Sequence, residues 1–121
     1  MHKLKLSKKD RIKSKKIFEA IIYNGKKELI GDIFVRWLKT SDDKNEIKAA
    51  FTVPKKKFKR AVDRNRIKRL LREAYRLNKH ILYKNDKSLF VLFTYIGNQK
   101  PSYAQIEDNI KKILNKINEG S

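Results

Sequence analysis

Basic and polar side chains gather on one face of the segment from Ala61 to Arg76, where their types and spacing suit phosphate binding. On a helix that advances about 100° per residue, one side carries Asn65, Lys68, Arg69, Arg72 and Arg76. The roughly opposite side carries Ile67, Leu70, Leu71, Ala74, Leu77 and Asn78. Arg64 and Arg66 fall on the two flanks of the cationic side. Because guanidinium groups form forked hydrogen bonds with phosphate, the pattern predicts a helix with one face on a core and the other on a polyanion.

A second concentration of cations leads directly into this segment. Its members are Lys55, Lys56, Lys57, Lys59 and Arg60. A run of charge is often only a solvated surface. On the helix, however, Lys68, Arg72 and Arg76 repeat at intervals of four, where like charges repel, and only Glu73 is nearby to relieve them. A pattern that costs stability favours an external anion. The Asn65 amide would suit a backbone or sugar hydroxyl of such a ligand.

Other site chemistries find little support in this sequence. The only histidines are His2 and His80, and there is no cysteine, so neither a histidine pair nor a thiolate site for zinc is indicated. The carboxylates are scattered beside lysine and arginine, and no glycine-rich phosphate loop or nucleophile elbow occurs. We therefore expect no catalytic residue and no metal site in the protein.

The overall charge agrees with a polyanionic partner. The 121 residues include 32 lysine and arginine against 13 aspartate and glutamate, a formal charge of +19. Cations spread along the whole chain favour nucleic acid over a membrane surface. No stretch has the length of a signal peptide's apolar region or of a membrane span. We expect a cytoplasmic protein with one domain over residues 1–121, in which residues 1–13 form either a flexible basic arm that binds phosphate or simply a frayed terminus.

Apolar spacing predicts three helices. A short helix begins after Ser14 as its N-cap and ends in a left-handed cap at Asn24-Gly25. The cationic helix runs to about Lys79, with Asp63 either as its N-cap or within its first turn. A final helix carries Ile106, Ile110, Ile113, Leu114 and Ile117. It starts at a capping box formed by Ser102 and Gln105.

Three strands are predicted between the helices. Residues 29–38 and 47–53 read as an antiparallel hairpin joined by the polar turn at 40–46. The nearly continuous apolar run at 88–96 reads as a central strand covered on both faces. The order helix-strand-strand-helix-strand-helix gives the α+β class, one sheet with three helices. If the last two strands run parallel, the cationic helix is their crossover, and such connections are almost always right-handed.

The aromatic side chains are more typical of a core than of a binding surface. They are Phe18, Phe34, Trp37, Phe51, Phe90 and Phe93. If one face of the sheet is open, however, Phe34, Trp37 or Phe51 would offer planes on which unpaired bases stack.

The segment Arg64-Asn65-Arg66-Ile67-Lys68-Arg69-Leu70-Leu71-Arg72 closely resembles the signature of the bacterial ribonuclease P protein subunit. Val53-Pro54-Lys55-Lys56 and Ala61-Val62 precede it as in that family. The basic start at 11–13, Ile17-Phe18, the Phe34-Val35-Arg36-Trp37 strand and the final helix follow the family's order. The resemblance therefore covers nearly the whole chain.

The resemblance implies an accessory protein that binds the catalytic RNA of ribonuclease P and helps it remove 5′ leaders from precursor tRNA. It implies that the RNA, with magnesium ions, performs the hydrolysis. We expect the protein alone to be a monomer. The resemblance also implies that the crossover into the last strand is left-handed, against the general rule, and we follow the family. The residues that would face the RNA are Lys55, Lys56, Arg60, Arg64, Asn65, Arg66, Lys68, Arg69, Arg72 and Arg76.

A leader-binding cleft between the first helix and the sheet is also implied by the resemblance. It maps onto Phe18, Phe34 and Trp37, and we place Ile22 and Phe51 beside them. Ile22 stands where relatives often carry a second aromatic residue, and Trp37 where a tyrosine is common. Tyr95-Ile96-Gly97 lacks an arginine that many members have at that point.

Two other classes compete with this interpretation. A structural RNA-binding protein of the ribosomal type fits the charge and the fold, but it does not require the Arg64-Asn65-Arg66 triplet after a Val-Pro-Lys-Lys strand end. A helix-turn-helix DNA-binding protein needs a second helix joined by a tight turn. Strand-like segments flank the cationic helix instead.

Overall fold

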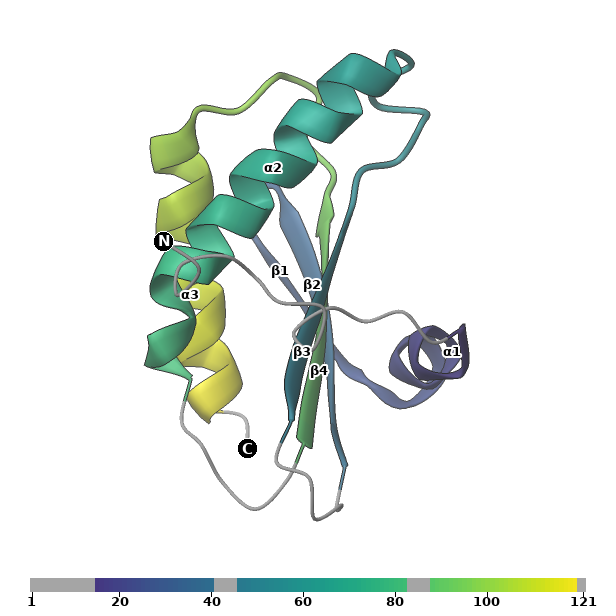
Figure 1. Ribbon diagram of the computed structural model, residues 1–121, viewed down its shortest axis with the longest axis vertical. Helices are drawn as coiled ribbons and strands as arrows, with labels where there is room; N and C mark the ends of the chain where they lie inside the picture. The colour runs from purple at the N-terminus through teal and green to yellow at the C-terminus, as the bar shows by residue number, and fades with distance from the viewer. Residues whose placement is uncertain (1–14, 41–45, 83–87, 120–121) are drawn as a thin grey trace.

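The computed structural model describes residues 15–40, 46–82 and 88–119 and contains three helices and four strands in these parts (Figure 1). In chain order they are α1 (Lys15–Asn24), β1 (Lys26–Ile30), β2 (Ile33–Thr40), β3 (Ile47–Thr52), α2 (Ala61–Asn78), β4 (Ser88–Tyr95) and α3 (Tyr103–Glu119), with a short 3-10 helix, η3 (Lys79–Ile81), after α2. The predicted class, helices and element order are confirmed, with β1 as an additional strand. The predicted arm at 1–13, the Ser14 cap and most of the turns at 40–46 and 85–86 lie outside the described residues.

The strand order in the sheet is β1-β2-β4-β3. β4 pairs antiparallel with β2 and parallel with β3. The predicted hairpin between residues 29–38 and 47–53 is therefore wrong, because β4 lies between β2 and β3. All but one of the residues of β4 are buried. A strand that is apolar on both faces buries the most surface in a central place, which explains why β4 separates the two less apolar strands.

The segment predicted as one strand at 29–38 is two strands joined by a tight turn. β1 and β2 pair antiparallel from Lys26↔Trp37 to Ile30↔Ile33. Between them Gly31 has a φ of 59°, a left-handed conformation that a two-residue hairpin turn requires and glycine adopts without strain. A Cβ atom at Gly31 would also collide with the Asn109 side chain of α3.

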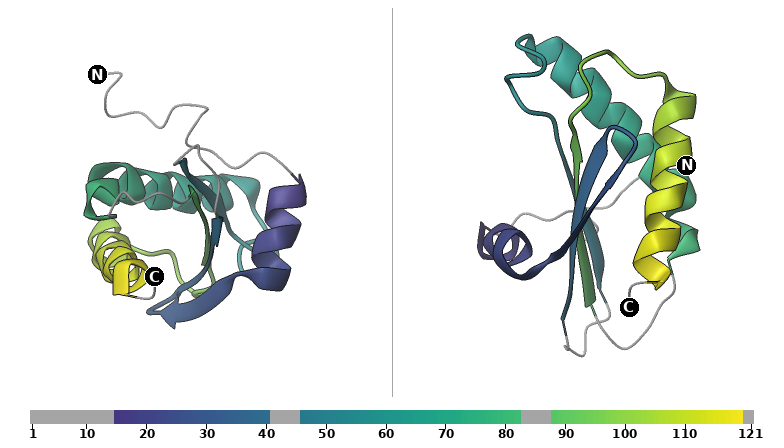
Figure 2. Two further views of the ribbon diagram at one scale, coloured as in Figure 1. Left: turned by 90° about the horizontal axis from the view of Figure 1, so that it is seen from below. Right: turned by 180° about the vertical axis from the view of Figure 1, so that it is seen from behind.

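Helix α2 connects the parallel strands β3 and β4 on one side of the sheet (Figures 1 and 2). Both strands run in the same direction, and the chain leaves β3, returns along α2 and re-enters the sheet at β4, the neighbour nearer to β1. This path gives a left-handed crossover, as the family resemblance implies, and an exception to the general rule.

The helices divide the core into two parts. α2 and α3 cover one face of the sheet and α1 covers the other, as the end-on view in Figure 2 shows. The larger cluster joins α2 and α3 to the sheet through Tyr75, Phe93 and Ile110, which are almost fully buried. The smaller cluster joins Ile21 of α1 to Phe90 and Leu92 of β4. Only a short helix therefore protects the second face.

The helix ends agree in part with the predictions. The capping box of α3 is confirmed, since the Gln105 backbone nitrogen donates to Ser102 Oγ (3.2 Å) and the Ser102 backbone nitrogen donates to Gln105 Oε1 (3.1 Å). Arg60 is the N-cap of α2, which places Asp63 in the first turn. The left-handed cap at Gly25 is wrong, because Gly25 lacks a positive φ. Glycine is needed there because a Cβ atom would collide with Ile21 O and approach Trp37 O to 2.8 Å.

Candidate nucleic-acid interface

The outer face of α2 presents the predicted cations to solvent. Asn65, Arg66 and Arg69 are exposed, and Lys68 is half-buried. The opposite face buries Ile67, Leu71, Ala74, Tyr75 and Asn78. The predicted division into an apolar and a cationic face is thus confirmed in its main residues, although Leu77 of the predicted apolar face is exposed. Tyr75 was missed because it lies at the border between the two faces.

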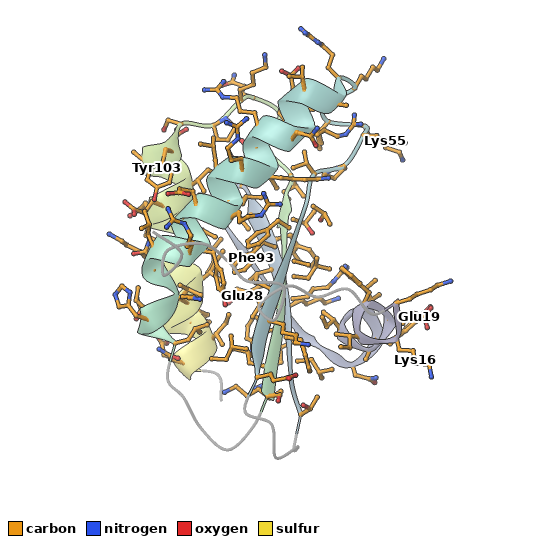
Figure 3. The ribbon with its side chains drawn as sticks, viewed as in Figure 1. Lys16, Glu19, Glu28, Lys55, Phe93 and Tyr103 are labelled. Carbon is orange, nitrogen blue, oxygen red and sulfur yellow. The ribbon has the colours of Figure 1, made fainter. Side chains whose placement is uncertain are left out.

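The loop before α2 brings a second group of cations to the helix N-terminus. Lys55, Lys56 and Arg60 are exposed, and Figure 3 shows Lys55 near the N-terminal end of α2. The Pro54 carbonyl accepts hydrogen bonds from the backbone nitrogens of Lys57 (3.1 Å) and Phe58 (3.4 Å). The Phe58 ring, only 8% exposed, anchors the loop in the core. The loop and the helix therefore form one continuous cationic surface, which we call the α2 surface. Its cations are Lys55, Lys56, Lys59 and Arg60 of the loop and Arg64, Arg66, Lys68, Arg69, Arg72 and Arg76 of the helix.

Arg64 differs from the other arginines of the α2 surface. Its Nη1 donates to the carbonyl oxygens of Phe58 and Lys59, both at 2.8 Å. The side chain is directed back toward the loop, and the residue is half-buried. The sequence indicated a flank position on the helix but gave no sign of these backbone partners.

Arg72 and Arg76 are half-buried and also have partners within the protein. Arg76 forms an ion pair with Glu73, the carboxylate that the sequence singled out. The Arg72 guanidinium lies 5.9 Å from the centroid of the Phe51 ring, within cation-π range. These contacts hold the Arg72 and Arg76 side chains close to the protein, whereas Arg66 and Arg69, nearer the start of α2, are exposed to solvent.

Ion pairing distinguishes α2 from α3. The lysines of α3 face carboxylates: Lys111 Nζ lies 4.0 Å from Glu107, Lys112 Nζ 3.0 Å from Asp108 and Lys116 Nζ 3.6 Å from Glu28. By contrast, several cations of the α2 surface have no carboxylate within ion-pairing distance among the described residues. They are Lys55, Lys56, Lys59, Arg60, Arg66, Lys68 and Arg69. Of the two outer helices, α2 with the loop before it therefore carries the stronger positive potential.

Three of the five predicted cleft residues lie on the α1 side of the sheet. Phe18 packs against the smaller core cluster, and Phe34 belongs to the face of β2 that looks toward α1. Ile22 of α1 is 49% exposed. The Arg36 guanidinium lies 4.7 Å from the centroid of the half-buried Phe34 ring, so an aromatic plane and a cation occur together here.

Trp37 and Phe51 do not belong to that side, and their placement in the cleft is wrong. Trp37 is 4% exposed and lies in the larger core cluster, between the sheet and the helices α2 and α3. Phe51 stacks on Phe93, with ring centroids 5.4 Å apart, and meets Tyr75 edge-on at 5.8 Å. Figure 3 shows Phe93 on the α2 side of the sheet. Neither ring can contact a ligand on the α1 side while the fold is intact.

The residues that share a face with Phe34 were not singled out in the sequence. Thr94 pairs with both Phe34 and Thr52 in the sheet register, and the Thr52 and Thr94 hydroxyl oxygens are 2.9 Å apart. Leu29, the register partner of Phe34 on β1, is 57% exposed. Alternate residues of one strand point to the same face, so Arg36 lies on the face of Phe34. Paired residues of adjacent strands also share a face, which adds Leu29, Thr94 and Thr52 once the strand pairing is known.

A polar network joins α2 to α3 behind the α2 surface. The Asn78 amide donates to Ala74 O (2.8 Å) and Glu107 Oε2 (3.1 Å), and the Tyr103 hydroxyl donates to the same carboxylate oxygen at 3.1 Å. These hydrogen bonds, that of Asn78 first, lower the pKa of Glu107. Burial and the contact with Glu107 raise the pKa of Tyr103. The network fixes α2 against α3 through a charged acceptor.

The described residues contain neither a candidate metal cluster nor a membrane-spanning helix. Within residues 15–40, 46–82 and 88–119, no group of three or more histidine, cysteine, aspartate or glutamate side chains is placed to hold a metal ion. No helix of these segments has the length and apolar character that crossing a membrane requires.

The sheet, its left-handed crossover and the exposed cations of α2 define a small basic α+β protein. The sequence model of the Ribonuclease P family matches residues 6–118. The chain is 32% identical to the ribonuclease P protein component of Porphyromonas gingivalis over 117 residues, 93% of this chain and 85% of that protein. It is 30% identical to the corresponding protein of Chlorobium phaeobacteroides, with 97% and 90% covered. The chain therefore belongs to the ribonuclease P protein family.

Solved structures show the same fold. The RNase P protein from Thermotoga maritima superposes with a TM-score of 0.72 at 20% identity, covering 88% of this chain and 96% of that one. The protein from Staphylococcus aureus superposes with a TM-score of 0.68 at 24% identity, covering 94% and 92%. The ribosomal-type alternative is not favoured, since the family model spans nearly the whole chain.

Proposed function

We propose that this chain is the protein subunit of ribonuclease P, which binds the catalytic RNA and the 5′ leader of precursor tRNA and assists removal of the leader. Family membership carries the proposal. The observation that supports it independently is the contrast between the two outer helices. The lysines of α3 face carboxylates, whereas Arg66 and Arg69 of α2 face none among the described residues.

The α2 surface is the proposed contact with the catalytic RNA. A positive surface without nearby carboxylates attracts the phosphate backbone and gains free energy by releasing its counterions. Arg66 and Arg69 are placed for direct phosphate contacts because they are exposed on α2, and Lys55, Lys56 and Arg60 extend the contact along the loop. Lys68, Arg72 and Arg76, which are half-buried, border it.

The α1 side of the sheet is the proposed contact with the leader. Phe34 with Arg36 above it, the Thr52–Thr94 hydroxyl pair and the neighbouring Phe18 and Ile22 combine a stacking plane, a cation and hydrogen-bonding groups. Single-stranded nucleic acid is bound by this combination of features. The leader would thus bind on the opposite side of the sheet from α2.

The proposal assigns hydrolysis to the RNA subunit and its magnesium ions. The carboxylates nearest the α2 surface are already engaged, Asp63 with Lys100 (3.1 Å) and Glu73 with Arg76. Magnesium in proteins is usually held by carboxylates together with substrate phosphates, and the α2 surface is cationic. The protein's own residues therefore bind and orient RNA. We further propose that the free protein is a cytoplasmic monomer.

A cleavage assay tests the function. Purified protein is added to a bacterial ribonuclease P RNA at low magnesium, and removal of the leader from a precursor tRNA is followed. We expect the protein to raise the cleavage rate, because its cations replace part of the screening that magnesium otherwise supplies. An equally basic protein without this fold serves as the control. If neither protein raises the rate, or both raise it equally, the proposed function is wrong.

A further inference from the structure

Arg64 lies on a flank of the α2 surface, and the hydrogen bonds of its side chain are made within the protein. Both hydrogen bonds of Nη1 go to neutral carbonyl oxygens, those of Phe58 and Lys59. The Arg60 carbonyl in turn accepts from the backbone nitrogens of Asp63 and Arg64, both at 3.2 Å. Three consecutive carbonyls of the loop therefore converge on the first turn of α2 and on the Arg64 side chain.

This arrangement holds together a segment that its own charges oppose. Lys59, Arg60 and Arg64 are close in sequence, and like charges repel over such distances. The nearest carboxylate, Asp63, is occupied by Lys100 of the loop after β4, at 3.1 Å. The loop conformation thus depends on hydrogen bonds rather than on neutralisation. Phe58 fixes one end of the segment in the core, beside the Tyr95 ring at 6.2 Å, and Arg64 fixes the other.

We propose that Arg64 is a positioning residue, which orders residues 58–60 so that Lys59 and Arg60 are preset for phosphate, whereas Arg66 makes a phosphate contact of its own. This inference rests on the proposed function of the α2 surface. The two arginines share a residue type and a charge, and they differ in surroundings. The Arg66 side chain is exposed and makes no hydrogen bond or ion pair with the described residues, while Arg64 is half-buried and its side chain is hydrogen-bonded to the loop. A preset loop avoids the entropy cost of ordering its backbone on binding.

The two roles predict different salt dependence, which makes Arg66→Ala the matched control for Arg64→Ala. Binding to a transcribed bacterial ribonuclease P RNA is measured at several salt concentrations with the full-length protein. Loss of a phosphate contact lowers the log-log slope by about 0.7 to 0.9, and we expect this for Arg66→Ala. For Arg64→Ala we expect an unchanged slope and an affinity about tenfold lower, the equivalent of ordering one backbone residue on binding.

Hydrogen exchange in the free protein gives a second readout. We expect faster amide exchange confined to residues 55–64 in Arg64→Ala and no change in Arg66→Ala, since only the first substitution releases the loop. If Arg64→Ala does not fold, Arg64→Met removes the hydrogen-bond donors and keeps an apolar stem, and the same two results are expected.

The outcomes separate the inference from the proposed function. A wild-type protein that fails to bind the RNA contradicts the function. If the wild type binds and Arg64→Ala lowers the slope as much as Arg66→Ala does, with unchanged exchange, then Arg64 is a direct phosphate contact and the positioning role is wrong. Wild-type affinity in Arg64→Ala would overturn the inference as well.

Discussion

Replacing Trp37 with alanine tests whether this residue belongs to the core or to the leader-binding side. Trp37 is 4% exposed and lies between the sheet and the helices α2 and α3. Truncating such a side chain costs about 3–5 kcal/mol in free energy of unfolding. A domain of this length has a free energy of unfolding of about 6–18 kcal/mol. The variant should therefore fold, with a much smaller free energy of unfolding.

The matched variant is Phe34→Ala, on the same strand and the opposite face. The Phe34 ring is half-buried, and its loss should cost only about 1 kcal/mol. With a urea m-value of about 2 kcal/mol/M, the unfolding midpoint should fall by about 1.5–2.5 M for Trp37→Ala and by about 0.5 M for Phe34→Ala. Circular dichroism during urea titration measures both shifts.

Fluorescence provides an independent check, because Trp37 is the only tryptophan of the chain. We expect acrylamide to quench its emission weakly in the native protein and strongly in urea, since the indole is shielded from solvent only when the protein is folded. A single-stranded leader oligonucleotide should leave the emission unchanged. Similar urea midpoints for the two variants, or direct quenching by the oligonucleotide, would refute the assignment of Trp37 to the core.

The α2 surface, the α1 side of the sheet, Glu107 and Gly31 can each be tested by a single substitution. Arg69→Ala should flatten the salt dependence of RNA binding by about 0.7 to 0.9 in log-log slope, whereas Lys112→Ala should not, because Lys112 already faces Asp108; equal slopes for the two variants would mean that the α2 surface is only solvated. Phe18→Ala should reduce the preference for leader-bearing precursor over mature tRNA in a binding assay, and equal losses for both RNAs would indicate a purely structural role. The hydrogen bonds of Glu107 lower its pKa in the folded state, so the unfolded chain binds a proton at Glu107 first as the pH falls. The free energy of unfolding should therefore decrease as the pH drops from about 4.5 through the folded pKa. Urea unfolding between pH 7 and pH 3 should show a smaller decrease of this free energy in Glu107→Gln than in the wild type. Gly31→Ala should lower stability by about 1–2 kcal/mol in the same assay, because of its left-handed φ alone, and by more where the Asn109 side chain cannot move.

The sequence predicted the secondary structure well wherever local patterns decide it. The amphipathic spacing of α2 and the capping box of α3 depend on residues close in the chain, and both appear in the structure. The strand order could not be predicted in this way. It depends on which strand is covered on both faces, and β4 takes the central place only through competition with segments far along the chain.

The candidate site shows the same division. The exposure of Arg66 and Arg69 follows from helical periodicity and was predictable. Strand periodicity also implies that Phe34 and Trp37 face opposite sides, because residues three apart on a strand cannot share a face. The family resemblance alone does not carry this information. The partners of Arg64 were not predictable, because they depend on the path of a loop that is set by the burial of Phe58.

The central position of β4 has a consequence for synthesis of the protein. Ile33 pairs with Tyr95 and Thr40 with Ser88, so the loop closed by the β2–β4 pair contains β3 and all of α2. Until Tyr95 has left the ribosome, β2 and β3 lack the strand that joins them, and α2 lacks the sheet against which its apolar face packs. The cationic helix α2 is therefore synthesised before β4, the central strand of the sheet on which it packs. A growing chain therefore carries these charges before the fold that presents them on one surface is complete.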